Sequence, residues 1–260
     1  MILDEICEHK RREIDAVKAA MPLSDIEDRI KNVGPARDFR AAFRGNGISL
    51  IAEVKRASPS KGVLMDNMDP ATLGAIYERS GAVAISVLTD EKYFQGSLAD
   101  LVSVRRAVDV PCLRKEFIID PYQIYESRAA SADAILLIVR ILSDEELREF
   151  QALAHDLGMA CLVETRDAAE IERALEADAA IIGINNRDLT TFEVDMTRTL
   201  EIKTMVPGGK VLVSESGIHT RDDVRRLEKG GIDAILVGEA LITSDDISGK
   251  IRELLGHDEG

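Results

Sequence analysis

The sequence predicts an α/β protein, a (βα)8 TIM barrel with an N-terminal helical extension, and three observations lead to this prediction. The chain has 260 residues, a length that fits one large α/β barrel. From about residue 48 onward, short apolar runs alternate with amphipathic segments. Eight such runs occur in series, as a barrel of this type requires. A doubly wound sheet is the main alternative, but it favours a Gly-rich turn after the first strand, and this chain has none there.

The predicted strands are short runs of Ile, Val, Leu or Ala without clean polar alternation. Parallel strands that are buried on both faces have this composition. In chain order the eight runs are residues 48–54, 83–88, 110–113, 134–139, 160–163, 180–184, 211–213 and 234–237.

The segments between the runs have helical periodicity and recognisable start signals. Asp120 precedes a proline, which favours a helix that begins there. Ser143, with a glutamate three residues later, fits a capping box. Thr220 precedes a segment with acidic residues in its first turn, and Gly230 and Gly231 can end that helix.

Residues 1–47 stand outside the repeat. The segment from Ile2 to Met21 spaces apolar residues among many charged ones and predicts an amphipathic helix. We expect this N-terminal extension to pack on the barrel, so that residues 1–260 form a single domain.

Composition excludes several classes of partner. The net charge is −14, which argues against nucleic acid because a phosphate backbone needs a basic face. The longest apolar stretch, residues 134–139, is too short to cross a membrane, and no secretory signal is visible. Three widely spaced cysteines suit a reducing compartment, so we expect a cytoplasmic protein. No metal-binding motif or histidine cluster occurs, and we expect no metal site.

Charged residues follow several of the predicted strands, at the end of the barrel where chemistry takes place in this fold. Glu53 and Lys55 end the first run and face the same side, because they are two residues apart. Lys115, Glu164 and Glu215 end the third, fifth and seventh runs. One such charge is more often a solvated loop residue, but five together predict a Lys/Glu cluster for general acid–base catalysis. A lysine close to another lysine there would lose its proton more easily, and the pKa of a glutamate could move either way, so the sequence settles neither shift.

Two glycine turns suggest a phosphate site. Ser216 and Gly217 follow the seventh run, and Gly238 and Glu239 follow the eighth. In this fold, loops after the seventh and eighth strands commonly bind phosphate through backbone N–H groups. Any turn can require glycine, so the evidence rests on the pair of positions and not on either glycine alone.

The loop after the first strand, residues 55–62, is a local basic island in an acidic chain. Lys55, Arg56 and Lys61 are its charged residues, and we expect them to bind an anion. The alternative is a solvated turn set by its Ser-Pro sequence. Phe94 and Phe117 follow the second and third runs and either hold a flat aromatic group or fill the core.

Five sequence blocks together resemble the indole-3-glycerol phosphate synthase family of tryptophan biosynthesis. They are residues 51–62, 88–97, 114–117, 184–189 and 214–218, and the resemblance covers essentially the whole chain. It implies a carboxy-lyase that converts 1-(2-carboxyphenylamino)-1-deoxyribulose 5-phosphate to indole-3-glycerol phosphate, releasing carbon dioxide and water, without a cofactor. The small-molecule partner is then a phosphosugar. We expect a monomer and leave a homodimer open.

The resemblance also implies roles for individual residues. Lys115 is the general acid at the ribulose carbonyl, and Lys55 holds the carboxylate that leaves. Glu164 and Glu53 transfer protons, whereas Asn185 and Glu215 orient the ring amine and the sugar hydroxyls. The substrate-binding residues that it implies are Ser58, Phe94, Phe117, Leu136, Arg187, Leu189, Ser216, Gly217, Gly238 and Glu239.

Two positions depart from the family pattern. Glu116 stands where aspartate is common, and we expect no consequence. Glu239 stands where serine is common, and its carboxylate would repel a nearby phosphate. We therefore expect this side chain to point away and leave its N–H to contribute. The remaining alternatives are another phosphosugar barrel, such as a phosphoribosylanthranilate isomerase, and a barrel that only binds phosphosugars.

Overall fold

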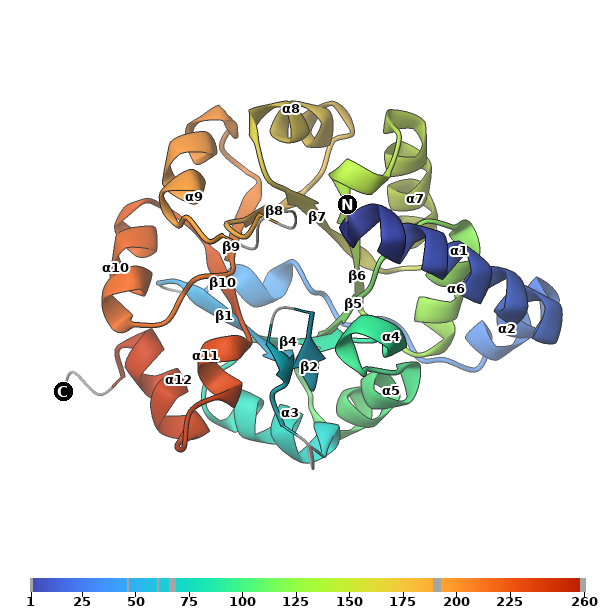
Figure 1. Ribbon diagram of the computed structural model, residues 1–260, viewed down its shortest axis with the longest axis horizontal. Helices are drawn as coiled ribbons and strands as arrows, with labels where there is room; N and C mark the ends of the chain where they lie inside the picture. Colours follow the sequence, from blue (N-terminus) through green and yellow to red (C-terminus); the bar gives the residue numbers. More distant parts are fainter. Residues whose placement is uncertain (1, 46, 60, 66–68, 189–192, 258–260) are drawn as a thin grey trace.

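Eight parallel strands close into a barrel with helices around it, which confirms the predicted (βα)8 fold (Figure 1). The computed structural model describes residues 2–45, 47–59, 61–65, 69–188 and 193–257. Each barrel strand pairs with its neighbours in chain order, and β1 pairs with both β4 and β10 to close the barrel. The strands are β1 Ser49–Val54, β4 Ala84–Leu88, β5 Cys112–Lys115, β6 Ala134–Ile138, β7 Ala160–Thr165, β8 Ile181–Asn185, β9 Val211–Glu215 and β10 Ala234–Val237.

Several strands extend past the apolar runs that predicted them. The β5 strand continues to Lys115, which pairs with Leu88, and β9 continues to Glu215, which pairs with Asn185. These charged residues belong to the hydrogen-bonded ladder although the apolar runs that predicted the strands end before them. The strands themselves therefore carry Glu53, Lys115, Glu164, Asn185 and Glu215, whereas the other candidate residues after them lie on the connecting segments.

The helices begin where the caps predict. Asp120, Ser143 and Thr220 each form a capping box, and the helix that Thr220 begins ends before Gly230. The helices around the barrel are α3 Pro70–Arg79, α5 Leu98–Ala107, α6 Pro121–Ala129, α7 Asp144–Asp156, α8 Ala168–Glu176, α9 Thr197–Ile202, α10 Arg221–Lys229 and α12 Ile247–Leu255. Shorter elements near the strand ends are the hairpin β2 Ala57–Ser58 with β3 Gly62–Val63, and the helices α4 Glu91–Phe94 and α11 Glu239–Ile242.

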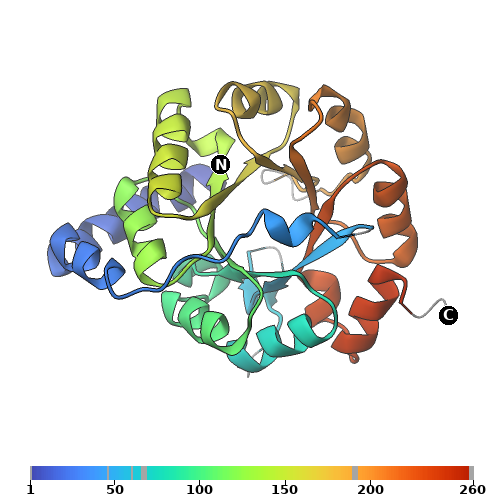
Figure 2. The ribbon, with the colours of Figure 1, turned by 180° about the vertical axis from the view of Figure 1, so that it is seen from behind.

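The N-terminal extension reaches both ends of the barrel. Helix α1, Ile2–Ala20, starts near the carboxyl ends of the strands and runs outward to α2, Leu23–Ile30, which packs beside α6 (Figure 1). The chain then crosses to the opposite end, where a short helix, Ala41–Phe43, lies beneath the barrel (Figure 2). Phe39 and Phe43 are buried there in the core that fills the barrel interior. This burial supports treating the chain as a single domain, which stays a prediction.

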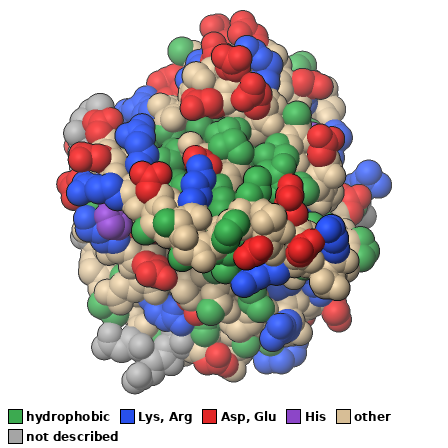
Figure 3. Space-filling model, turned by 90° about the vertical axis from the view of Figure 1, so that its right-hand side faces the viewer, with side chains coloured by type: hydrophobic (Ala, Val, Ile, Leu, Met, Phe, Trp, Pro, Cys, Tyr) green, Lys and Arg blue, Asp and Glu red, His purple; other side chains and the backbone are tan. Residues whose placement is uncertain are grey.

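Charged side chains of both signs cover the outside of the protein. On the face that Figure 3 shows, acidic and basic side chains are intermixed around an apolar patch. In the part of the chain that the structure describes, no helix is both long and apolar enough to cross a membrane.

Candidate active site

One pocket lies at the carboxyl ends of the barrel strands, and it collects the predicted site residues. The alternation of a β-strand explains this position, because residues two apart face the same side. Ile51 and Leu113 fill the barrel interior, and Glu53 and Lys115 continue the same inward-facing rows to the pocket. The predicted residues that line it are Glu53, Lys55, Ser58, Phe94, Lys115, Phe117, Leu136, Glu164, Asn185, Arg187, Glu215, Ser216, Gly217, Gly238 and Glu239. Leu189 lies outside the described residues.

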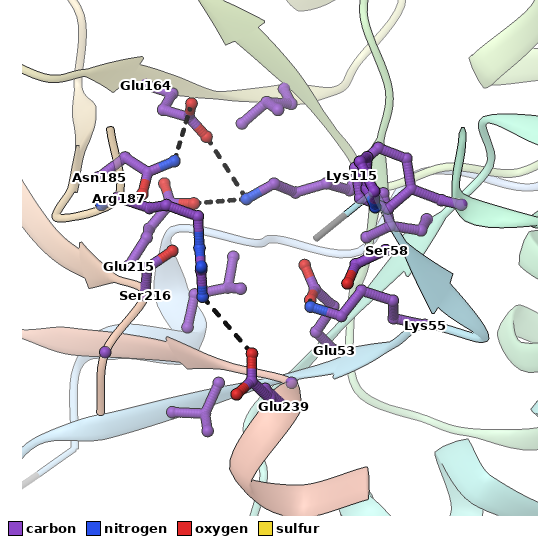
Figure 4. Close-up of a pocket in the computed structure, with 18 of the residues that line it drawn as sticks. Glu53, Lys55, Ser58, Lys115, Glu164, Asn185, Arg187, Glu215, Ser216 and Glu239 are labelled. Carbon is purple, nitrogen blue, oxygen red and sulfur yellow. Dashed lines mark hydrogen bonds and ion pairs between the residues drawn. The ribbon is translucent and has the colours of Figure 1, made fainter. Parts of the chain in front are cut away.

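Lys115 is the centre of the polar part of the pocket (Figure 4). Its Nζ lies 2.5 Å from Glu215 Oε2 and 3.4 Å from Glu164 Oε2. Asn185 donates a hydrogen bond of 3.2 Å from Nδ2 to Glu164 Oε1 and holds that carboxylate in place. Both glutamates are buried, so the lysine bridges two carboxylates that have little contact with solvent. Such an arrangement places one proton donor between two proton acceptors.

Burial and neighbouring charges shift the proton affinities of this cluster. Burial alone would lower the pKa of Lys115, but the carboxylates of Glu215, Glu164 and Glu53 raise it above its ordinary value. The sequence leaves the direction of this shift open, and the structure decides it, because carboxylates and not another lysine lie next to the ammonium group. Lys115 is a protonated ammonium group at neutral pH, as a general acid must be.

The pKa values of Glu215 and Glu53, the carboxyl groups beside Lys115 and Lys55, are shifted in opposite directions. Burial raises the pKa of Glu215 to about 8, although its contact with Lys115 lowers it. Burial also tends to raise the pKa of Glu53, but Lys55 and Lys115 together bring it below its ordinary value. Glu53 Oε2 lies 2.9 Å from Lys55 Nζ. Glu53 is therefore the carboxylate that ionises more readily, and Glu215 is the one that holds its proton more strongly.

The basic island after β1 is largely neutralised within the protein. Arg56 does not line the pocket but forms a bidentate ion pair with Asp100. Lys61 Nζ lies 2.5 Å from Glu239 Oε1. Of the three predicted cations, Lys55 alone lines the pocket, so the expectation that Arg56 faces an anion there is wrong. The loop folds back as the β2–β3 hairpin, which sends the neighbouring side chains to different partners.

Glu239 does not turn away from the pocket as expected. Its Oε2 lies 3.5 Å from Arg187 Nη2, and its other oxygen binds Lys61 (Figure 4). The two cations hold the carboxylate at the pocket and bring the pKa of Glu239 below its ordinary value, against the effect of burial. An acidic side chain next to the proposed phosphate position is thus neutralised by two cations that also attract anions.

Glycine is required in the two turns for different steric reasons. Ser216 and Gly217 have φ angles of +69° and +82°, and a Cβ on Gly217 would lie 2.4 Å from Val194 Cγ1. Gly238 has an ordinary φ, but a Cβ there would lie 2.4 Å from Glu53 Oε2. The first turn therefore requires glycine for its backbone, whereas Gly238 leaves space for a candidate catalytic carboxylate.

The other half of the pocket is apolar. The rings of Phe94 and Phe117 are 6.1 Å apart and tilted by 35°. Leu136 and Ile138 extend this surface. Helix α1 adds Ile2, Leu3 and Ile6, which sequence reasoning missed as pocket residues. Their only sequence signal is the amphipathic pattern, which predicts a buried face but not what that face covers.

The polar and apolar halves together suit a ligand with an aromatic ring and an anionic group. Among the described residues, no group of three or more His, Cys, Asp or Glu side chains is arranged to hold a metal ion. Lys115 between Glu164 and Glu215, with the Lys55–Glu53 pair beside it, can perform general acid–base chemistry on an organic anion.

Comparisons with solved structures bear on the fold. Among solved structures, thiamine phosphate pyrophosphorylase from Pyrococcus furiosus is similar, with a TM-score of 0.61, 16% identity and coverage of 82% of this chain and 95% of that one. A tryptophan synthase α-subunit from the same organism has a TM-score of 0.61 and 16% identity, and the match covers 80% of this chain and 98% of that one. At this identity the structures share the fold alone.

Sequence comparison identifies much closer relatives. The indole-3-glycerol phosphate synthase of Dehalococcoides mccartyi strain CBDB1 is 49% identical over 259 residues, which cover 98% of this chain and 100% of that protein. The enzyme of the same name from Roseiflexus sp. strain RS-1 is 50% identical over 264 residues, 98% of each chain. The family model described as indole-3-glycerol phosphate synthase matches residues 3–254. This chain therefore belongs to the indole-3-glycerol phosphate synthase family.

Proposed function

We propose that this protein closes the indole ring of indole-3-glycerol phosphate from 1-(2-carboxyphenylamino)-1-deoxyribulose 5-phosphate, with release of carbon dioxide and water. The observation that carries the proposal is the position of Lys115, protonated between two buried glutamates at the border of the apolar half of the pocket. Phe94, Phe117 and Lys115 line the same pocket, so a substrate whose aryl ring packs against the two rings would place its ribulose chain toward this lysine.

Ring closure needs an acid at the carbonyl oxygen of the ribulose chain. As the ring carbon that carries the carboxylate attacks this carbonyl carbon, negative charge develops on the oxygen. Lys115 donates the proton, and Glu164 and Glu215 keep its ammonium group in position. Asn185 in turn holds Glu164.

Loss of carbon dioxide needs a cation that orients the leaving carboxylate. Lys55 is suited to this role, because it lines the pocket and its ammonium group lies 2.9 Å from Glu53. Glu53 is ionised and serves as a base in the dehydration that follows. Ser58, Gly217 and Gly238 contribute to phosphate binding, together with the cationic groups of Lys61 and Arg187.

Appearance of indole fluorescence tests the proposal. The chain is mixed with the carboxyphenylamino substrate at saturating concentration, and fluorescence of the indole product is followed with time. A steady increase that depends on enzyme concentration is expected. No signal would contradict the proposed reaction and favour a barrel that only binds phosphosugars, although no residue expected for catalysis is missing here. The predictions of a monomer, of a cytoplasmic location and of no nucleic-acid binding are separate and stay predictions.

A further inference from the structure

A second cluster of charges is buried beneath helix α1, at the edge of the pocket, which one of its members, Glu116, also lines. Lys10 Nζ lies 2.9 Å from Asp90 Oδ2 and 3.2 Å from Glu116 Oε1. Glu13, on the same helix, contributes a third carboxylate oxygen at 3.0 Å. Lys10 is 1% exposed, Asp90 0% and Glu116 2%. An ammonium group is rarely so removed from solvent, and here two buried carboxylates compensate its charge.

The two carboxylates also fix backbone on the apolar side of the pocket. Asp90 caps helix α4 and accepts a 2.7 Å hydrogen bond from the backbone N–H of Tyr93, and the next residue in this helix is Phe94. Glu116 Oε1 accepts a 2.9 Å hydrogen bond from the N–H of Phe117. The groups that hold Lys10 therefore also hold the segments that carry both aromatic rings.

Lys10 lies one turn after the part of α1 that covers the pocket. Ile2, Leu3 and Ile6 line the pocket, and Ile6 and Lys10 share a helix face because they are four residues apart. Removal of the ammonium group would leave Asp90 and Glu116 buried without their shared cation, which is a strongly unfavourable state. Glu116 would keep its contact of 3.5 Å with Arg114, whereas Asp90 would lose its ion pair with Lys10 and would have to shift, admit water or take up a proton.

We propose that Lys10 is a positioning residue for the proposed reaction. Its ammonium group fixes α1 as a cover over the aryl end of the substrate and aligns the two segments that carry Phe94 and Phe117. The proposal rests on the proposed function, since it assigns the aryl ring to this side of the pocket. It also gives Glu116 a role: its carboxylate binds the cation of α1 and, with the same oxygen, the N–H of Phe117.

The test compares Lys10→Met with a matched control on the same helix. Lys10→Met keeps the length of the side chain and removes its charge. Lys18→Met removes an exposed ion pair of 2.6 Å between α1 and Asp120, and neither of these two residues lines the pocket. For Lys10→Met we expect KM to rise about tenfold, because one face of the aryl ring loses its apolar cover, with kcat within about threefold of wild type. For Lys18→Met both constants stay close to wild type.

A folded Lys10→Met variant with a wild-type KM would overturn the proposal, and so would a loss confined to kcat. Circular dichroism monitors folding. If Lys10→Met does not fold, Glu116→Gln replaces it, because the amide oxygen still accepts from Phe117 while one charge is lost. Its KM should rise about threefold, and an unchanged KM would equally overturn the proposal. Absence of turnover in the wild-type protein would contradict the proposed function, which separates the two failures.

Discussion

Gly183 leaves space for the Glu215 carboxylate, and alanine at this position tests how close Glu215 must be to Lys115. A Cβ on Gly183 would lie 2.2 Å from Glu215 Oε1 and 3.3 Å from Leu162 Cδ1. Non-bonded atoms settle about 3.5 Å apart, so the carboxylate must retreat by about 1 Å. The contact of 2.5 Å between Glu215 and Lys115 would then lengthen toward the limit of a hydrogen bond.

This displacement should affect both the rate and its pH dependence. A misplacement of about 1 Å in a catalytic group lowers kcat about 100-fold. The pKa of Glu215, already raised to about 8 by burial, should rise further, because its contact with Lys115 is the largest influence that lowers it. The limb of the pH–rate profile that reports Glu215 should therefore move to higher pH.

The assay is the initial rate of indole formation, measured across about pH 5 to 10 for wild type and variant. Gly208→Ala is the control, since a Cβ there would meet no described atom within 4 Å. Overpacking should cost Gly183→Ala about 1–3 kcal/mol of unfolding free energy, so the rates are compared well below the unfolding temperature. A wild-type kcat with an unshifted profile would refute the argument that Gly183 positions Glu215.

Three further substitutions test the site. Lys115→Ala should lower kcat about 1000-fold in steady-state assays, because the acid at the carbonyl is lost. The pKa of Glu215 rises from 4.5 to about 8 on folding, so this group stabilises the fold at acidic pH and its contribution is lost as pH rises through about 8. Urea unfolding of Glu215→Gln should therefore show a weaker pH dependence. Glu239→Gln removes the carboxylate charge beside Lys61 and Arg187, which would repel a phosphate, and should lower KM about threefold.

Each of these expectations has a contrary outcome. Turnover near wild type in Lys115→Ala would remove the lysine from the acid role. An unchanged pH dependence in Glu215→Gln would mean that another group titrates in this range. A rise in KM for Glu239→Gln would indicate that the carboxylate assists binding. Added salt should raise KM for wild type, because it screens the attraction between these cations and a phosphate dianion.

Much of the fold and of the candidate site could be predicted from the sequence, because a segment that is buried has a characteristic local composition. Strands covered on both faces leave apolar runs, and caps such as Ser143 mark where helices begin. Once the barrel is predicted, the residues that end its strands must converge at one edge. That convergence is why Glu53, Lys115 and Glu215 could be chosen without knowing any distance between them.

The sequence by itself determined which chemical groups meet at the end of the barrel, whereas only the tertiary structure decided which of them touch. Lys115 and Glu215 are 100 positions apart, and barrel closure brings them to 2.5 Å. That contact helps to raise the pKa of the lysine, a shift whose direction the sequence leaves open. The partners of Arg56, Glu239 and Lys10 likewise come from distant segments. Electrostatic effects depend on separations of a few ångströms, which strand register and side-chain packing set and local sequence does not encode.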